Sequence, residues 1–128
     1  MSIPEELRYT EDHEWVALDG RTARVGITDY AQRALGDVVY VSVPAPGSRV
    51  TAGDPCGEVE STKSVSDLFA PLDGEVAEVN SEVDEDPGLV NSDPYGVGWL
   101  MTITVDADAD TSGLLTADQY TAITADSQ

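Results

Sequence analysis

Lys63 is the residue best suited to covalent chemistry. It is the only lysine in the chain, and the other basic residues are all arginines: Arg8, Arg21, Arg24, Arg33 and Arg49. A lysine amine can lose its proton and attack an activated acid, whereas a guanidinium group stays protonated. A single lysine among arginines therefore indicates a site of covalent acylation. An ordinary solvated surface lysine is the alternative, and the count alone favours neither.

The residues on either side of Lys63 predict a hairpin that holds it clear of the protein body. Residues 56–59 have the composition of a strand, and residues 65–69 supply apolar side chains for a second one. Residues 61–64 between them are small and polar, as expected at a hairpin tip. An acyl group on such a tip would be a tethered arm, which raises the effective concentration of its reactive end at every site within reach.

The stretch Glu60-Ser61-Thr62-Lys63-Ser64 resembles the attachment sequence of lipoyl domains, and it lacks the two methionines that flank the lysine of biotin carriers. A wider pattern is similar to the glycine cleavage system H proteins. Its parts occur in the family's order along almost the whole chain: the signature at 9–16, Gly-Ile-Thr-Asp-Tyr-Ala-Gln at 26–32, the valine-rich run at 35–41, Ser-Asp-Leu at 66–68, Gly-Glu-Val at 74–76 and the run at 89–100.

This resemblance implies a mainly β fold, in one domain that spans residues 1–128. The expected architecture is a barrel-sandwich hybrid of two small antiparallel sheets, of the lipoyl and biotinyl type, with a few short helices and a C-terminal helix. Local signals agree with it. Asp19-Gly20 predicts a hairpin turn, Thr28 predicts the cap of a helix over 29–35 that ends at Gly36, and Thr116 with Gln119 forms a capping box for a helix that runs to about residue 125.

A weak internal repeat also bears on the fold. The pattern Pro-x-x-Gly occurs at 44–47 and at 71–74, and a valine-containing strand follows each copy. Two copies favour a pseudo-symmetric pair of small sheets, with the Lys63 hairpin crossing between them. Gly53 and Asn80 end the copies, and both residue types tolerate a left-handed backbone.

The resemblance further implies a lipoylated carrier of the glycine cleavage system. Lys63 would form an amide with lipoic acid, attached by a lipoate ligase or lipoyltransferase. A pyridoxal-phosphate-dependent glycine decarboxylase would load the aminomethyl group of glycine onto the arm, a tetrahydrofolate-dependent aminomethyltransferase would unload it, and a dihydrolipoyl dehydrogenase would reoxidise the arm. The chain itself would be a covalent carrier without turnover of its own, and hence not an enzyme.

By the same resemblance, Glu14 and Asp67 face the loaded arm. A cationic amine on the arm would favour a charge-assisted hydrogen bond to a carboxylate. The cargo must also be shielded from water, which would hydrolyse it. The alternative for each residue is a solvated surface charge, the usual state of a carboxylate in so acidic a chain.

Catalytic and metal sites are disfavoured by the scarcity of suitable residues. His13 and Cys56 are the only histidine and the only cysteine. They could form a thiolate pair, but no third residue that would orient them is evident, and Cys56 lies in an apolar strand context typical of a packed, inert thiol. One histidine and one cysteine make no metal cluster. We therefore expect no catalytic residue and no metal.

Charge narrows the choice of partners and of compartment. The chain has 25 acidic and 6 basic residues and a net charge of -19. This excess disfavours binding to nucleic acid and to anionic membranes. It also predicts self-repulsion that salt must screen, so we expect a halophilic protein. Residues 1–6 have neither the basic nor the apolar region of a signal peptide, and no run approaches the roughly 20 apolar residues of a membrane span, so the expected location is the cytoplasm.

Two other functions remain open. The first is a lipoyl carrier, or a lipoate relay, for 2-oxoacid dehydrogenase complexes, although the aromatic-rich N-terminus and the C-terminal helix argue against a dehydrogenase domain. The second is an unmodified acidic binding module. An adduct on Lys63 would exclude the latter.

Overall fold

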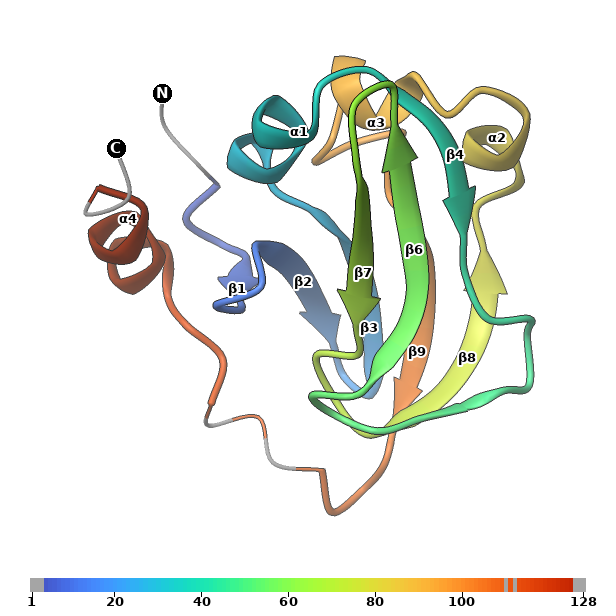
Figure 1. Cartoon of the computed structure of the whole chain (residues 1–128). Coiled ribbons are helices and arrows are strands. Elements are labelled where there is room, and N and C mark those ends of the chain that lie inside the picture. Colours follow the sequence, from blue (N-terminus) through green and yellow to red (C-terminus); the bar gives the residue numbers. More distant parts are fainter. Residues whose placement is uncertain (1–3, 110, 112, 126–128) are drawn as a thin grey trace.

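Two antiparallel sheets face each other in the computed structural model, which describes residues 4–109, 111 and 113–125 (Figure 1). The larger sheet has the strand order β1-β2-β3-β9-β8-β5. Its strands are β1 (Arg8–Tyr9), β2 (Glu14–Asp19), β3 (Thr22–Ile27), β5 (Arg49–Val50), β8 (Gly74–Val79) and β9 (Met101–Val105). The smaller sheet has the order β4-β6-β7, with β4 (Val38–Ser42), β6 (Pro55–Ser61) and β7 (Val65–Phe69).

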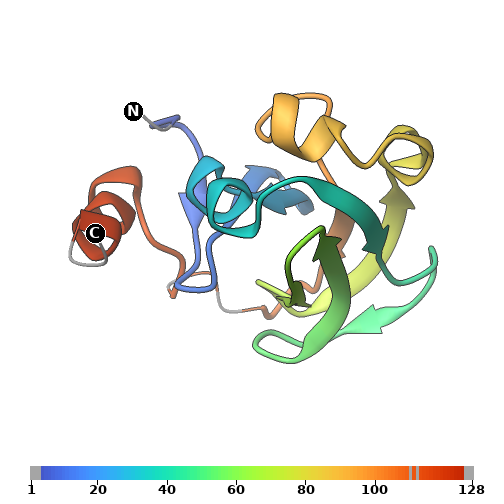
Figure 2. The ribbon, with the colours of Figure 1, turned by 45° about the horizontal axis from the view of Figure 1, so that its top comes forward.

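Four short helices complete the described part of the chain: α1 (Asp29–Leu35), α2 (Ser81–Glu85), α3 (Leu89–Ser92) and α4 (Ala117–Ala125). α4 lies to one side with β1, away from the three-stranded sheet (Figures 1 and 2). None of the helices described is long and apolar enough to cross a membrane. The expected mainly β fold with two antiparallel sheets and a C-terminal helix is confirmed, although the sheets are unequal in size and do not close into a barrel.

The core between the sheets follows from strand alternation. In β3, Ala23 and Val25 are buried while Thr22 and Arg24 are exposed, as expected for a strand with one face on the core. Inner residues of the other strands, and Ala70 and Leu72 from the loop between β7 and β8, join them in one apolar cluster: Val16, Val50, Ala70, Leu72, Val76, Met101, Ile103 and Val105. A second cluster lies where α1, α2 and α3 meet the small sheet: Ile27, Leu35, Val38, Val41, Val59, Leu68, Val83, Val90 and Leu100.

The predicted caps and turns form as expected. Gly20 has φ 62° in the turn between β2 and β3. The Thr28 side chain accepts the N–H of Ala31 at the start of α1. At the start of α4, the N–H of Gln119 donates to Thr116 Oγ1 (3.2 Å) and the N–H of Thr116 donates to Gln119 Oε1 (2.9 Å), which is a complete capping box.

The Pro-x-x-Gly repeat predicted a pseudo-symmetric pair of small sheets, and this prediction is wrong. The strands that follow the two copies, β5 and β8, pair with each other in the six-stranded sheet, with Val50 opposite Gly74. The reason is that Val50 and Val76 both bury their side chains in the same apolar cluster. Of the two residues that end the copies, Gly53 has a left-handed backbone (φ 87°), whereas Asn80 has φ −85° and its side chain accepts the N–H of Glu82 as the cap of α2.

Candidate functional site

Lys63 stands exposed at the tip between β6 and β7, as predicted. Ser61, which is 6% exposed, builds this tip. Its Oγ accepts the N–H groups of Lys63 (3.3 Å) and Ser64 (3.1 Å), and its own N–H donates to the Ser64 carbonyl (2.8 Å). Because these bonds fix the backbone on both sides of Lys63, a group attached to its amine would swing from a firm base.

The tip is also fastened to the end of α1. The Thr62 N–H donates to the Asp37 carbonyl at 3.0 Å. Gly36, the C-cap of α1, has φ 85° and ψ −158°, a backbone conformation almost restricted to glycine. A Cβ placed on Gly36 would lie 3.3 Å from Lys63 Cε. The alkyl chain of Lys63 therefore crosses the backbone of Gly36, where a glycine leaves it room.

Asn91 on α3 fixes the segment between α1 and β4, against which the Lys63 tip is fastened. Its Oδ1 accepts the N–H of Val38 (2.8 Å), and its Nδ2 donates to the Gly36 carbonyl and to Gln32 Oε1 (both 2.9 Å). One side chain thus ties together the end of α1 and the start of β4, next to the tip that carries Lys63. Reasoning from the sequence did not single out this residue.

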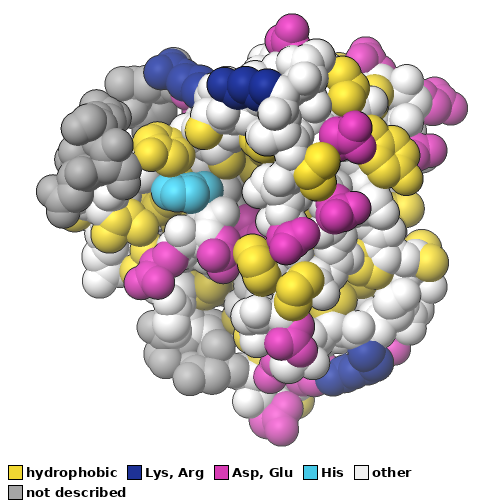
Figure 3. Space-filling model, viewed as in Figure 1, with side chains coloured by type: hydrophobic (Ala, Val, Ile, Leu, Met, Phe, Trp, Pro, Cys, Tyr) yellow, Lys and Arg dark blue, Asp and Glu magenta, His cyan; other side chains and the backbone are white. Residues whose placement is uncertain are grey.

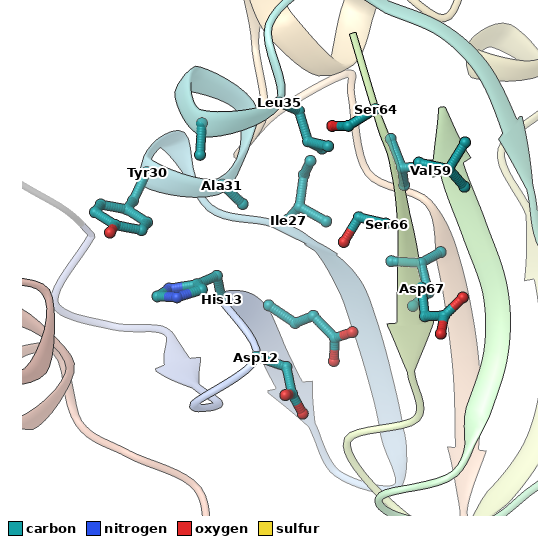
Figure 4. Close-up of a pocket in the computed structure, with 14 residues that line it drawn as sticks. Asp12, His13, Ile27, Tyr30, Ala31, Leu35, Val59, Ser64, Ser66 and Asp67 are labelled. Atoms are coloured by element: carbon teal, nitrogen blue, oxygen red, sulfur yellow. The ribbon is translucent and has the colours of Figure 1, made fainter. Parts of the chain in front are cut away.

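A cavity of about 320 Å³ opens beside the hairpin, between α1, β7 and the start of β2 (Figure 4). Its walls combine apolar with charged and polar side chains, and they come from segments that are distant in the sequence. The lining residues are Asp12, His13, Glu14, Ile27, Tyr30, Ala31, Ala34, Leu35, Val59, Ser64, Val65, Ser66, Asp67 and Leu68.

Glu14 is the charged residue buried in this cavity, with only 2% of its surface exposed. Its Oε2 accepts the N–H of Phe69 at 2.8 Å. Its Oε1 is buried without a hydrogen-bond partner among the residues that the structure describes. Burial raises the pKa of Glu14 to about 8, the Asp12 charge adds to the rise, and the Phe69 N–H opposes it. An orphaned carboxylate oxygen in a cavity is suited to a ligand that brings a donor or a positive charge.

Asp67 also lines the cavity, but at its edge. The Asp67 side chain lies on the side of β7 away from His13, whereas the Ser66 hydroxyl points toward His13 (Figure 4). Strand alternation explains the difference, because Ser66 shares its face of β7 with the buried Leu68. Ser66 is a residue that sequence reasoning missed, and its position two residues before an apolar one was the available signal.

His13 forms a further part of the wall. It is the one non-glycine residue with positive φ (65°) in the described chain. Its ring stacks on Tyr30 with centroids 4.6 Å apart, and its Nδ1 lies 2.8 Å from the hydroxyl of Tyr120. Burial lowers the pKa of His13, and the nearby Asp12 opposes the change. Burial therefore favours the neutral imidazole.

The thiol of Cys56 lies apart from this wall. Cys56 is half-buried, packs against both inner clusters and does not line the cavity. Burial, with a smaller contribution from Glu14, raises the pKa of its thiol to about 11, so the reactive thiolate is disfavoured. Within the described ranges, no group of three or more His, Cys, Asp or Glu side chains is arranged to hold a metal ion.

Sequence comparison identifies the family to which this arrangement belongs. Residues 7–127 match the model of the glycine cleavage H-protein family. The chain belongs to the glycine cleavage H-protein family. Among similar members, the glycine cleavage system H protein of Beutenbergia cavernae is 56% identical over 124 residues, which cover 97% of this chain and 98% of that protein. The glycine cleavage system H protein of Micrococcus luteus is 60% identical over 121 residues, 93% of this chain and 94% of that protein.

A solved structure agrees with the fold of this H-protein family member. The crystal structure of a glycine cleavage system H protein from Mycobacterium marinum matches with a TM-score of 0.88 and 46% sequence identity, over 96% of this chain and 99% of that one. The fold implied by the resemblance is confirmed.

Proposed function

We propose that this chain is a lipoylated carrier of the glycine cleavage system, which moves the aminomethyl group of glycine on an arm attached to Lys63. One observation carries the proposal. The only lysine of the chain stands on a fixed hairpin tip beside a cavity, and that cavity contains a buried carboxylate with an unpartnered oxygen.

The residues present fit a lipoyl group. The Lys63 amine would form the amide, and the Lys63 alkyl chain already lies close over the backbone of Gly36. When bound, the lipoyl group supplies the sulfur chemistry that holds the cargo. Ile27, Leu35 and Leu68 in the cavity wall would cover the hydrocarbon part and exclude water.

Glu14 would recognise the amine of the cargo. Its Oε1 is free to accept a charge-assisted hydrogen bond, while the Phe69 N–H holds the other oxygen in place. A cation at this position favours the ionised carboxylate, so amine binding would lower the raised pKa of Glu14. Asp67, at the edge of the cavity, would contribute negative charge near the entrance.

The partners of such a carrier are enzymes. They are a pyridoxal-phosphate-dependent glycine decarboxylase, a tetrahydrofolate-dependent aminomethyltransferase, a dihydrolipoyl dehydrogenase and the lipoate ligase or lipoyltransferase that modifies Lys63. The chain would have no turnover of its own and would act as one domain in the cytoplasm. On the face that Figure 3 shows, acidic side chains outnumber basic ones and are interspersed with hydrophobic side chains, so the partners would need basic patches or strong salt screening to approach it.

Reconstitution with the enzymes tests this function. Lipoylated wild-type protein should support glycine–bicarbonate exchange by the decarboxylase and transfer of the one-carbon unit to tetrahydrofolate. Lys63→Arg should reduce both to background while circular dichroism shows an intact fold, because a guanidinium cannot be acylated. Exchange retained by Lys63→Arg, or no exchange with the lipoylated wild type, would contradict the proposal, and the second result would favour a lipoate relay.

A further inference from the structure

Tyr120, on the C-terminal helix α4, reaches the wall of the cavity from a distant part of the chain. Its hydroxyl lies 2.8 Å from His13 Nδ1 and 2.7 Å from Thr28 Oγ1. His13 lines the cavity, and Thr28 is the cap of α1, which supplies the wall residues Tyr30 and Ala31. One phenol on α4 therefore contacts both segments that form this side of the cavity.

The direction of the hydrogen bonds follows from the burial of Thr28, which is 0% exposed. Thr28 Oγ1 already accepts the N–H of Ala31 at 3.2 Å, so its own hydrogen needs an acceptor. The Tyr120 oxygen is the acceptor in contact with it. The Tyr120 hydrogen then points to His13 Nδ1, which places the imidazole proton on Nε2. The reverse order would leave the buried Thr28 hydrogen without a partner.

The backbone of His13 is held independently of Tyr120. Its N–H donates to the Thr10 carbonyl (3.1 Å) and its carbonyl accepts the N–H of Thr28 (3.0 Å). These two bonds support the left-handed conformation, which is unfavourable for a residue with a Cβ. The ring has separate contacts, the stack on Tyr30 and the bond to Tyr120. Loss of the Tyr120 hydroxyl should therefore release the ring, while the two backbone bonds keep the His13 backbone in place.

α4 itself is anchored through β1. Tyr9 and Leu115 exchange backbone hydrogen bonds of 2.9 and 2.7 Å just before α4 begins. The rings of Tyr9 and Tyr120 are stacked with centroids 4.9 Å apart, and both are buried. The Tyr9 hydroxyl donates to the Pro4 carbonyl at 2.6 Å and does not contact the cavity wall. The two tyrosines thus share one apolar cluster, but only Tyr120 is bonded to a residue that lines the cavity.

We propose that Tyr120 is a positioning residue for the arm cavity, through which the C-terminal helix orients the His13 ring and so stabilises the docked, loaded arm. The inference rests on the proposed carrier function and assigns a role to α4 within it. The titratable groups around His13 are Asp12 on its own loop, Tyr30 on α1 and Tyr120 on α4.

The test compares Tyr120→Phe with Tyr9→Phe in the full-length, lipoylated protein. The decarboxylase loads each protein with the aminomethyl group and is then removed, and the lifetime of the loaded arm against hydrolysis is measured at neutral pH. Tyr120→Phe loses the hydrogen bonds of the hydroxyl to His13 and to Thr28, and loss of the bond to His13 should shorten this lifetime about 3- to 10-fold. Tyr9→Phe removes a phenol hydroxyl that bonds only the Pro4 carbonyl among the described residues, and its lifetime should remain within about 2-fold of wild type.

Nitrogen-15 NMR of His13 gives a readout that general loosening of the fold would not produce. The wild type should show a neutral ring protonated at Nε2. Tyr120→Phe should show mixed tautomers and a higher His13 pKa, because the bond that favours the neutral ring is lost, while Tyr9→Phe should match the wild type.

Unchanged lifetime and tautomer in Tyr120→Phe would overturn the inference, as would equal shortening in both variants. Failure of the carrier function gives a different result: the decarboxylase would then load no aminomethyl group onto the lipoylated wild type, and the inference would fall with it.

Discussion

At the scale of the residue, Glu14 combines two features that together disfavour its ionised form. It is 2% exposed, and one of its oxygens has no partner among the described residues. Burial raises its pKa from 4.5 to about 8. The folded protein therefore binds this proton more tightly than the unfolded chain does, and folding becomes less favourable as the pH rises from about 4.5 to about 8.

Glu14→Gln should remove this pH dependence. The free energy of unfolding of the wild type should fall across that range by a component on the order of 4 kcal/mol, which the variant lacks because its amide does not ionise. Urea unfolding at several pH values in molar salt measures the difference. Glu58→Gln on β6 is the matched control, since it removes the same charge from an exposed position and should keep the wild-type slope. Parallel curves for wild type and Glu14→Gln would contradict the assignment.

At the scale of the element, Asn91 should contribute strongly to the stability of the fold, although it lies on the short helix α3. Asn91→Ala leaves the N–H of the buried Val38 and the carbonyl of Gly36 without their side-chain partner. We expect a loss of about 1–3 kcal/mol in the free energy of unfolding. Denaturant titration in molar salt checks it, with Ser92→Ala as control, because the Ser92 hydroxyl is exposed and should change stability by less than about 0.5 kcal/mol. Equal stability of the two variants would contradict the stabilising role of the Asn91 hydrogen bonds.

The elements that the sequence predicts correctly are those fixed by near neighbours. Thr28 caps α1 three residues ahead, and Thr116 and Gln119 bond to each other across one turn. Such bonds depend only on local spacing, so the pattern of residue types suffices to predict them.

Several features that the sequence did not reveal depend on distant partners. The bond that fixes the Glu14 carboxyl comes from an N–H 55 residues away, and the Tyr120 hydroxyl bonds His13, 107 residues away. The pairing of β5 with β8 likewise follows from a shared core, not from the repeat that both segments carry. Lys63 could be singled out from the sequence itself as the only lysine, at a predicted hairpin tip. Glu14 and Asp67 came from family resemblance, since in a chain with 25 acidic residues no local signal distinguishes one carboxylate from another.

At the scale of the whole molecule, the net charge of -19 should make stability depend on salt. Exposed charges repel over about 30 Å at 0.01 M salt but over only about 3 Å at 1 M. The midpoint of thermal unfolding should therefore rise as sodium chloride increases from millimolar to molar concentrations, followed by circular dichroism. A midpoint independent of salt would contradict the prediction that the protein is halophilic.

The attachment of an arm to Lys63 is the central claim, and peptide mapping tests it most directly. Trypsin cleaves after arginine and after unmodified lysine, and beyond Arg49 the only such site is Lys63. Unmodified protein should therefore yield the peptides 50–63 and 64–128. After incubation with lipoate, ATP and a lipoate ligase, the two should be replaced by a single peptide 50–128 that carries the mass of one lipoyl group. Complete cleavage after Lys63 in that sample, or an adduct on any other peptide, would contradict the account.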